Sequence, residues 1–202
     1  MTEIIIGGIK YTSKKEAFDA LNAITDKVSV CELNTGDRFI YGDIEWVKLD
    51  DAHGGVLVLA VSTYADFIFD KNDRNKWETS SLRKSLNETK NGHFTEKFLK
   101  DVVKEDLIEF ERDLTTDDGL TDYDTCKDFI SLYTCNEYRK YRKLIPECGS
   151  WHWTITADSL VHSNLVRLVF SDGSLRTHYA YLGSYGVRPL CVLKSDVEVE
   201  VE

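Results

Sequence analysis

The sequence is poor in the features that mark disordered, exported or membrane-spanning proteins. Only two of its 202 residues are proline, and it contains no low-complexity segment, so we expect no long disordered region. No apolar stretch approaches the roughly 20 residues that a membrane span needs. Residues 4–9 are apolar but few, and no basic residues precede them. The sequence therefore predicts neither a signal peptide nor contact with a membrane.

Positive charge is also scarce. Lys and Arg number 25 against 35 Asp and Glu, which gives a formal net charge of −10 and a pI near 5.0. Nucleic-acid binding depends on Lys and Arg contacts with phosphates, so we do not expect direct binding of nucleic acid. An acidic surface instead keeps a protein dispersed in water, or it faces a basic partner.

The residues of catalytic and metal sites are present but not in the patterns that such sites need. The five cysteines form no CxxC pair or Cys/His cluster, which argues against zinc and favours reduced thiols in a cytosolic compartment. The five histidines are scattered, without HExxH or GxSxG. His152 and His178 are the one pair that could be neighbours across a sheet. We therefore expect no enzyme activity, no metal and no cofactor.

Residues 151–193 carry the strongest strand pattern. Residues 165–170 and 175–182 are rich in β-branched, aromatic and apolar side chains. Asp172-Gly173 between them is a strong hairpin signal, because Gly accepts the positive φ of a tight turn. A second turn at Gly183–Gly186 leads into a last apolar strand, in which Pro189 is expected at a strand start, bulge or edge.

The rest of the chain predicts strands and helices in separate runs, and hence an α+β fold with a mixed or antiparallel sheet and a few helices. Strands are expected within residues 33–49, 56–62 and 106–110, a loop at 66–76, and helices at 80–90, 94–103 and 135–144. Residues 1–29 read as a small hairpin followed by a helix, with Ser13 and Glu16 as a capping box. We expect them to be an appendage to a main domain at residues 30–202.

Several residues are expected to be internal ties. Trp77 and Arg83 could form a polar pocket with Ser81 and Asn87, but a core tryptophan with a satisfied arginine beside it is the favoured interpretation. Arg188 precedes a proline and is therefore extended, which suits an arginine that bonds backbone carbonyls. Trp151 and Trp153 would share the core-facing side of one strand, with His152 on the other side.

Two stretches are candidate binding surfaces. Tyrosine joins a rigid apolar ring to a polar tip, which suits contact with a sugar or a protein. We expect such a surface at Tyr179, Tyr181 and Tyr185, with His152 beside it; a core position for these tyrosines stays an alternative.

The second candidate surface is acidic. Residues 101–128 carry eleven acidic residues against three basic ones. Asp117, Asp118 and Asp122 are its candidate binding residues, although a simple solvated face is the alternative. An EF-hand is excluded because only Asp118 supplies a carboxylate at the required spacing. An irregular calcium site is the weaker alternative.

Short motifs spread over residues 32–195 resemble the DUF6273 family of uncharacterised phage and Firmicutes proteins. The matching pieces are Gly36-Asp37, Ile44-Glu45-Trp46, residues 77–83 with Leu86-Asn87, Asp118-Gly119, residues 137–142, Trp151 and Trp153, Ser171-Asp172-Gly173, and Gly186-Val187-Arg188-Pro189. The closing motif and the tryptophan-rich segment also resemble the C-type-lectin-like fold. The resemblance implies a lectin-like core, a phage or prophage origin, and a place in the bacterial cytoplasm or a virion. It brings no activity with it.

The sequence thus favours a non-catalytic binding protein of phage or mobile-element origin that recognises a protein or glycan through an aromatic or loop surface. The alternative is an intracellular acidic inhibitor of a host defence nuclease, comparable to an anti-CRISPR protein, whose surface imitates a nucleic-acid backbone and blocks a basic groove.

Overall fold

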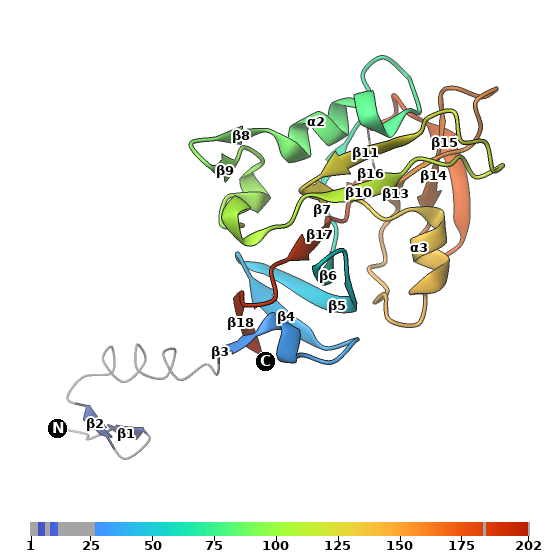
Figure 1. Ribbon diagram of the computed structural model, residues 1–202. Coiled ribbons are helices and arrows are strands. Elements are labelled where there is room, and N and C mark those ends of the chain that lie inside the picture. Colours follow the sequence, from blue (N-terminus) through green and yellow to red (C-terminus); the bar gives the residue numbers. More distant parts are fainter. Residues whose placement is uncertain (1–3, 7–8, 12–26, 184, 202) are drawn as a thin grey trace.

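The computed structural model describes residues 4–6, 9–11, 27–183 and 185–201, and they are mostly β-structure with two short helices. Two larger sheets form the framework of the described structure (Figure 1). One has seven strands in the order β12-β17-β6-β5-β4-β18-β3, and the other has five in the order β15-β14-β13-β16-β7. All pairs in these sheets are antiparallel except β13 with β16, which is parallel. The expected mixed sheet is confirmed, whereas no specific fold is identified.

The elements have the following bounds. The seven-stranded sheet contains β12 (Ile130–Ser131), β17 (Leu190–Leu193), β6 (Gly55–Ala60), β5 (Ile44–Ala52), β4 (Arg38–Tyr41), β18 (Glu198–Val201) and β3 (Lys27–Ser29). The five-stranded sheet contains β15 (Leu175–Tyr179), β14 (Leu165–Val169), β13 (His152–Ala157), β16 (Tyr185–Val187) and β7 (Tyr64–Phe67). Three further hairpins are β1 (Ile4–Ile6) with β2 (Ile9–Tyr11), β8 (Thr89–Lys90) with β9 (His93–Phe94), and β10 (Phe110–Asp113) with β11 (Thr125–Asp128). The helices are α2 (Ser81–Asn87) and α3 (Cys135–Lys140).

The centre of the seven-stranded sheet, at β6 and β17, is buried on both faces. Along β6, Val56, Val58 and Ala60 pack into the larger apolar core, which also holds Trp77 and Trp153. The alternate residues of β6 pack into a smaller core on the opposite face, together with tyrosines from α3 and its flanks. Successive side chains of a strand point to opposite faces. A strand buried on both sides therefore reads as the continuous apolar run that the sequence shows at residues 56–61.

The chain passes from one sheet to the other at Arg188-Pro189. The strand β16 ends at Val187 in the five-stranded sheet, and β17 starts at Leu190 in the seven-stranded sheet. Pro189 falls between the two strands, where its missing N–H costs no ladder bond, as its chemistry requires. Its carbonyl accepts a bond from Ala60 N (2.9 Å). The crossover therefore joins the strand that carries Tyr185, in the larger core, to a strand buried on both faces.

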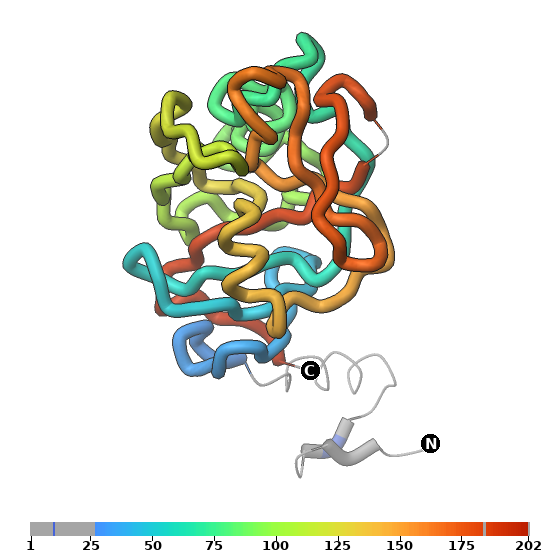
Figure 2. The backbone as a smooth tube through the Cα atoms, turned by 90° about the vertical axis from the view of Figure 1, so that its right-hand side faces the viewer, coloured from blue at the N-terminus to red at the C-terminus, as the bar shows by residue number. Residues whose placement is uncertain are grey.

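Helix α3 lies on the outside of the molecule between two loops (Figure 2). On one side, Arg139 of α3 bonds Asp117 (3.0 Å) in the loop after β10. On the other side, Tyr138 donates to the carbonyl of Gly173 (2.8 Å) in the β14–β15 hairpin. That hairpin is formed as the Asp-Gly signal predicts, and Gly173 has φ +76.

The prediction of a helix at residues 94–103 is wrong. The structure has a single 3-10 turn there, Lys97–Leu99. Phe94, Leu99 and Val102 are buried as the apolar spacing indicates. However, His93 forms a β-bridge with Val103, and a helix of ten residues would hold these ends about 15 Å apart.

Other boundaries also differ from the prediction. The strand expected at residues 106–110 begins only at Phe110, after a 3-10 turn at Lys104–Asp106. The segment predicted as a loop from residue 66 starts as the end of β7. Residues 27–29, assigned to the appendage, form β3 and pair with β18. β1 pairs with β2 as expected, and the helix predicted after Ser13 lies outside the described residues. Within those residues no helix is long and apolar enough to cross a membrane.

Candidate binding surface

Six rings form a continuous row of contacts at one end of the five-stranded sheet. The row runs, in the order of contact, through Phe170, Trp151, Tyr185, His178, Tyr179 and Tyr181. Its centroid separations are 3.9, 5.6, 5.1, 6.1 and 5.8 Å in that order. We call these six residues the aromatic row.

The strand registers explain how residues distant in sequence meet in the aromatic row. Trp153 pairs with Leu168, and Leu168 pairs with Arg176, so these three side chains share one face of the sheet. Two positions towards the β14–β15 hairpin, Trp151 and Phe170 lie on that same face. His178 also lies on this face, but in the other direction along β15, opposite Val166. The deeper residues of this face enter the larger core, while the residues at the end of the sheet reach the surface.

Three members of the aromatic row are exposed, and they are held in place by the others. Trp151 is 40% exposed, Tyr179 46% and Tyr181 48%. The indole of Trp151 stacks on the ring of Phe170 with an interplanar angle of 8°, and it also faces Tyr185 at 24°. The guanidinium of Arg176 lies 5.6 Å from the centre of the Phe170 ring, within cation–π range. A large ring that is both exposed and fixed binds a partner with little loss of side-chain entropy.

The surface predicted from sequence is therefore partly right. Tyr179 and Tyr181 are exposed, but Tyr185 is buried beneath Trp151 and beside Trp153. Trp151 was expected in the core and is instead the exposed tryptophan, because β13 begins at His152 and Trp151 lies beyond the covered part of the sheet. Phe170 and Arg176 were missed, although the two-residue alternation along 168–170 and 176–178 places them on the Trp151 side.

His152 is not part of the surface. It is 2% exposed and points into the smaller core, so its expected role as a binding residue is wrong. Its Nδ1 lies 2.8 Å from the carbonyl of Ser150, and its Nε2 is hydrogen bonded to the hydroxyl of Tyr133. His178 lies two strands away, on β15, opposite Val166. The two histidines are therefore not neighbours.

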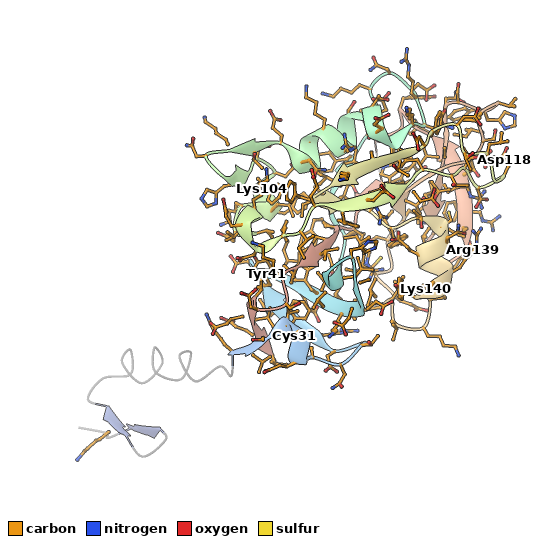
Figure 3. All side chains as sticks on the ribbon, in the orientation of Figure 1. Cys31, Tyr41, Lys104, Asp118, Arg139 and Lys140 are labelled. Atoms are coloured by element: carbon orange, nitrogen blue, oxygen red, sulfur yellow. The ribbon has the colours of Figure 1, made fainter. Side chains whose placement is uncertain are left out.

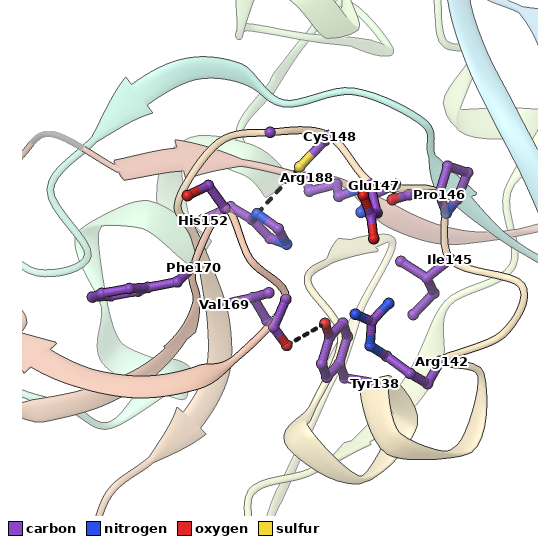
Figure 4. Close-up of a pocket in the computed structure, with 13 residues that line it drawn as sticks. Tyr138, Arg142, Ile145, Pro146, Glu147, Cys148, His152, Val169, Phe170 and Arg188 are labelled. Atoms are coloured by element: carbon purple, nitrogen blue, oxygen red, sulfur yellow. Dashed lines mark hydrogen bonds between the residues drawn. The ribbon is translucent and has the colours of Figure 1, made fainter.

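The hydrogen bonds of His152 fix its protonation. Burial lowers its pKa to about 4, so the ring is neutral at pH 7. Ser150 O can only accept, so Nδ1 carries the proton and Nε2 accepts from Tyr133, whose own pKa burial raises far above the usual range. Cys148 Sγ lies 3.4 Å from Nδ1, as Figure 4 shows. A protonated Nδ1 cannot take a proton from that thiol, so this pair lacks the geometry of a cysteine–histidine nucleophile.

The acidic candidates separate into different environments. Asp117 is tied to Arg139 (3.0 Å) and Arg167 (3.4 Å). Asp118 accepts a bond from Thr116 Oγ1, and Asp122 is exposed. In Figure 3, Asp118 lies at the opposite side of the molecule from Lys104, so the acidic segment is spread over a long surface. In the described part of the chain, no three His, Cys, Asp or Glu side chains are arranged to hold a metal ion.

The predicted internal ties around Trp77 and Arg83 are confirmed. Trp77 is buried, and its Nε1 donates to Asp128 Oδ2 (2.7 Å). Arg83 Nε donates to Asp128 Oδ1 (2.6 Å), and its Nη atoms donate to the carbonyls of Glu78 and Lys127. The one carboxylate therefore joins α2 to β11. Of the residues expected around a polar pocket, Trp77 is in the core, while Arg83 and Asn87 line an open surface hollow.

Arg188 is also an internal tie, as predicted. Its side chain is buried at the crossover between the two sheets. Nε donates to the carbonyl of Ala60 (2.8 Å), and Nη2 donates to those of Val61 (2.8 Å) and Pro146 (2.9 Å). A second buried arginine, Arg112, was not predicted; it makes a two-point ion pair with Glu137 of α3. The Thr134–Glu137 capping box is the sequence signal that marks this site.

No protein-family model, curated protein or solved structure matches this chain. The site is therefore interpreted from its own geometry.

Proposed function

We propose that this chain is a non-catalytic binding protein that recognises a protein or glycan partner through the aromatic row. The observation that carries the proposal is Trp151, a large ring that is 40% exposed yet stacked between Phe170 and Tyr185. Exposed rings held in this way are typical of the residues that contribute most to binding. Tyr179 and Tyr181 extend the row and add hydroxyl groups that can hydrogen bond a polar ligand.

In the described part of the chain, the Cys148–His152 pair and three further thiols lack the features of an activated nucleophile, which supports a binding role over a catalytic one. Nδ1 of His152 already carries a proton, so it cannot act as a base towards the Cys148 thiol. Burial raises the pKa of Cys135 and Cys191, and that of Cys126 to about 11, so these thiols stay protonated at neutral pH.

The resemblance to the DUF6273 family supports a phage or mobile-element origin, with a lectin-like core and a place in the bacterial cytoplasm or a virion. Under this proposal the aromatic row faces a component of the host cell or of the particle, and no cofactor is needed.

A binding screen with two arms tests the proposal. The wild-type protein is applied to a glycan array and is used to capture proteins from host lysate and envelope. We expect a signal in one arm that a Tyr179→Ala/Tyr181→Ala double variant weakens. If the protein binds nothing on the array and captures no protein, and if it turns over any small molecule, the proposal is contradicted.

The acidic-inhibitor alternative is favoured by one observation. Seven acidic side chains between residues 105 and 124 are exposed, and none forms an ion pair within the described residues: Glu105, Glu109, Glu111, Asp113, Asp118, Asp122 and Asp124. Such a row of charge complements a basic groove. Replacing Glu109 and Glu111 by Gln should then slow association with a captured nuclease and reduce its salt dependence, while leaving capture by the aromatic row unchanged.

A further inference from the structure

A small hollow lies beneath the β14–β15 hairpin, on the face of the sheet opposite to the aromatic row. Its walls include Tyr138, Arg142, Glu147, Cys148, His152 and Arg188. Figure 4 shows these side chains gathered around it, with the ring of Phe170 turned away. The cavity volume is about 20 Å³, which is room for one water-sized occupant.

Two guanidinium groups line this hollow without a carboxylate partner. No side-chain ion pair within 4.0 Å joins Arg142 or Arg188 to an acidic residue in the described chain. Arg188 is 1% exposed and donates only to neutral backbone carbonyls. A buried charge without a counter-charge is costly, so an anion that reaches it gains more than it would at the surface.

Arg142 is held in position by its neighbours. Its guanidinium lies 5.2 Å from the centre of the Tyr138 ring, and the Tyr138 hydroxyl is bonded to Gly173. A Cβ atom built on Gly173 would lie 2.1 Å from Arg142 Nη2, so the guanidinium packs directly against the hairpin backbone. Only glycine permits this approach, and its φ of +76 excludes most side chains as well.

Glu147 is the acidic residue at the hollow. It is exposed and forms no ion pair there. Its carboxylate makes no contact ion pair with either arginine, but it lowers the positive potential of the hollow and so opposes an incoming anion. Cys148, the next residue, brings a partly exposed thiol to the same wall, which makes the hollow accessible to chemical labelling.

From this geometry we propose that the hollow between Arg142 and Arg188 is a binding site for one small anionic group, such as a halide ion or one oxygen of a carboxylate. Two guanidinium groups supply charge-assisted donors, and the volume limits the occupant to one such group. The site lies apart from the exposed rings of the aromatic row and shares one residue with that row, Phe170.

Labelling of Cys148 tests the proposal in the intact protein. Iodoacetate is anionic and iodoacetamide is neutral; with either, the thiolate forms a C–S bond to the methylene carbon as the C–I bond breaks and iodide leaves. The rate at each cysteine is followed by peptide mass spectrometry, with exposed Cys31 as the internal reference. We expect the iodoacetate-to-iodoacetamide rate ratio at Cys148 to exceed that at Cys31 by about fivefold or more, since local positive charge concentrates anions.

Three variants sharpen this experiment. Arg142→Ala should bring the ratio at Cys148 down to that at Cys31, while Glu147→Gln should raise it. Arg74→Ala, which removes an exposed arginine outside the hollow, should leave it unchanged. Equal ratios at the two cysteines in the wild-type protein, or no effect of Arg142→Ala in a variant that keeps its melting temperature, would overturn the proposal.

Chloride provides a second measurement if Cys148 reacts with neither reagent. The chlorine-35 line of sodium chloride should broaden more with the wild-type protein than with Arg142→Ala, and sodium acetate should reverse the excess broadening. Equal broadening by the two proteins would overturn the anion site.

Discussion

Trp151 and Trp153 are two positions apart and share one side of the chain, yet they meet different surroundings. Trp153 is fully buried among Phe69, Tyr185 and the larger core, and its Nε1 donates to the carbonyl of Phe67 (2.9 Å). Trp151 lies just before the strand and stays 40% exposed. The amount of surface that each ring removes from water therefore separates a core residue from a candidate binding residue.

Trp153→Ala should lower the free energy of unfolding by roughly 3–5 kcal/mol, because it leaves a large cavity in the core. Trp151→Ala should cost only about 1 kcal/mol, since its ring is partly in water already. Urea denaturation of both variants measures this difference. Equal losses of stability would show that Trp151 is a core residue, and an unchanged midpoint for Trp153→Ala would refute its role in the core.

Even a conservative replacement of Arg188 should destabilise the fold. Arg188→Lys keeps a positive charge but loses the planar fork that reaches three carbonyls. We expect a loss of about 2 kcal/mol for Lys and about 4 kcal/mol for Ala, which also leaves buried acceptors unpaired. Thermal melts beside the wild type measure both. Midpoints within error of wild type for the two variants would contradict the role of Arg188 as a tie between the sheets.

His152 should make stability depend on pH. Burial lowers its pKa to about 4 from its ordinary value of 6.5, so the unfolded chain binds this proton more readily than the folded one. The stabilisation is complete above pH 6.5 and is lost as the pH falls towards 4. Between pH 7 and pH 5 the loss from this group should be about 2 kcal/mol.

Urea midpoints at pH 7, 6 and 5 measure this effect, with His162→Gln as a control that removes an exposed imidazole. The control should show the same pH dependence as the wild type. A free energy of unfolding that is flat between pH 7 and pH 5 would mean that His152 is not buried as described.

Single residues were predictable where their own chemistry fixes their surroundings. An arginine before a proline and a tryptophan ahead of a helix cap point to internal ties, and Arg188 and Trp77 are such ties. Exposure of Trp151 and burial of His152 and Tyr185 depend on where β13 begins and on what covers each face. The two-residue alternation of a strand predicts neither where β13 begins nor which parts of each face are covered.

At the scale of elements, α3 shows how a short helix depends on its contacts. The six-residue helix begins with a capping box, in which Thr134 Oγ1 accepts from Glu137 N (3.0 Å) and Glu137 accepts from Thr134 N (2.7 Å). Glu137 also pairs with buried Arg112 of β10. Burial opposes the charge on Glu137, but Arg112 holds the pKa of this carboxyl below its usual value.

Two substitutions separate the cap from the ion pair. Thr134→Ala should cost about 1 kcal/mol, as the loss of an N-cap does. Glu137→Gln should cost about 3 kcal/mol, because it leaves the Arg112 charge buried without a partner. Chemical denaturation gives both values. A loss for Glu137→Gln no larger than that for Thr134→Ala would show that the ion pair adds nothing to the cap.

Elements were predictable where local signals agree with tertiary pairing. The hairpin at Asp172-Gly173, the two-sided strand β6 and helix α2 follow the sequence closely. The helix expected at residues 94–103 fails because a bridge between His93 and Val103 fixes its ends. β3 and β18 were missed because they form only by pairing with each other and with β4, across more than 150 residues of chain.

At the scale of the whole molecule, the crossover at Arg188-Pro189 links the two sheets, and the two proposed sites lie around one hairpin. The aromatic row lies on one side of the β14–β15 hairpin, and the arginine-lined hollow lies on the other. The hairpin is predictable from sequence. The meeting of residues 142–152, 170–176 and 185–188 around it depends on the sheet order, which local patterns do not contain.

The most direct test of the proposed function compares Trp151→Ala with Val161→Ala in the same glycan array and envelope capture. Val161 is 84% exposed and lies outside the aromatic row, so its loss should leave binding unchanged. Trp151→Ala should keep a cooperative melt but weaken binding by about 30-fold, the effect of removing a residue worth about 2 kcal/mol. Full binding by a folded Trp151→Ala protein, at the strength of the Val161→Ala control, would contradict the proposed role of the aromatic row.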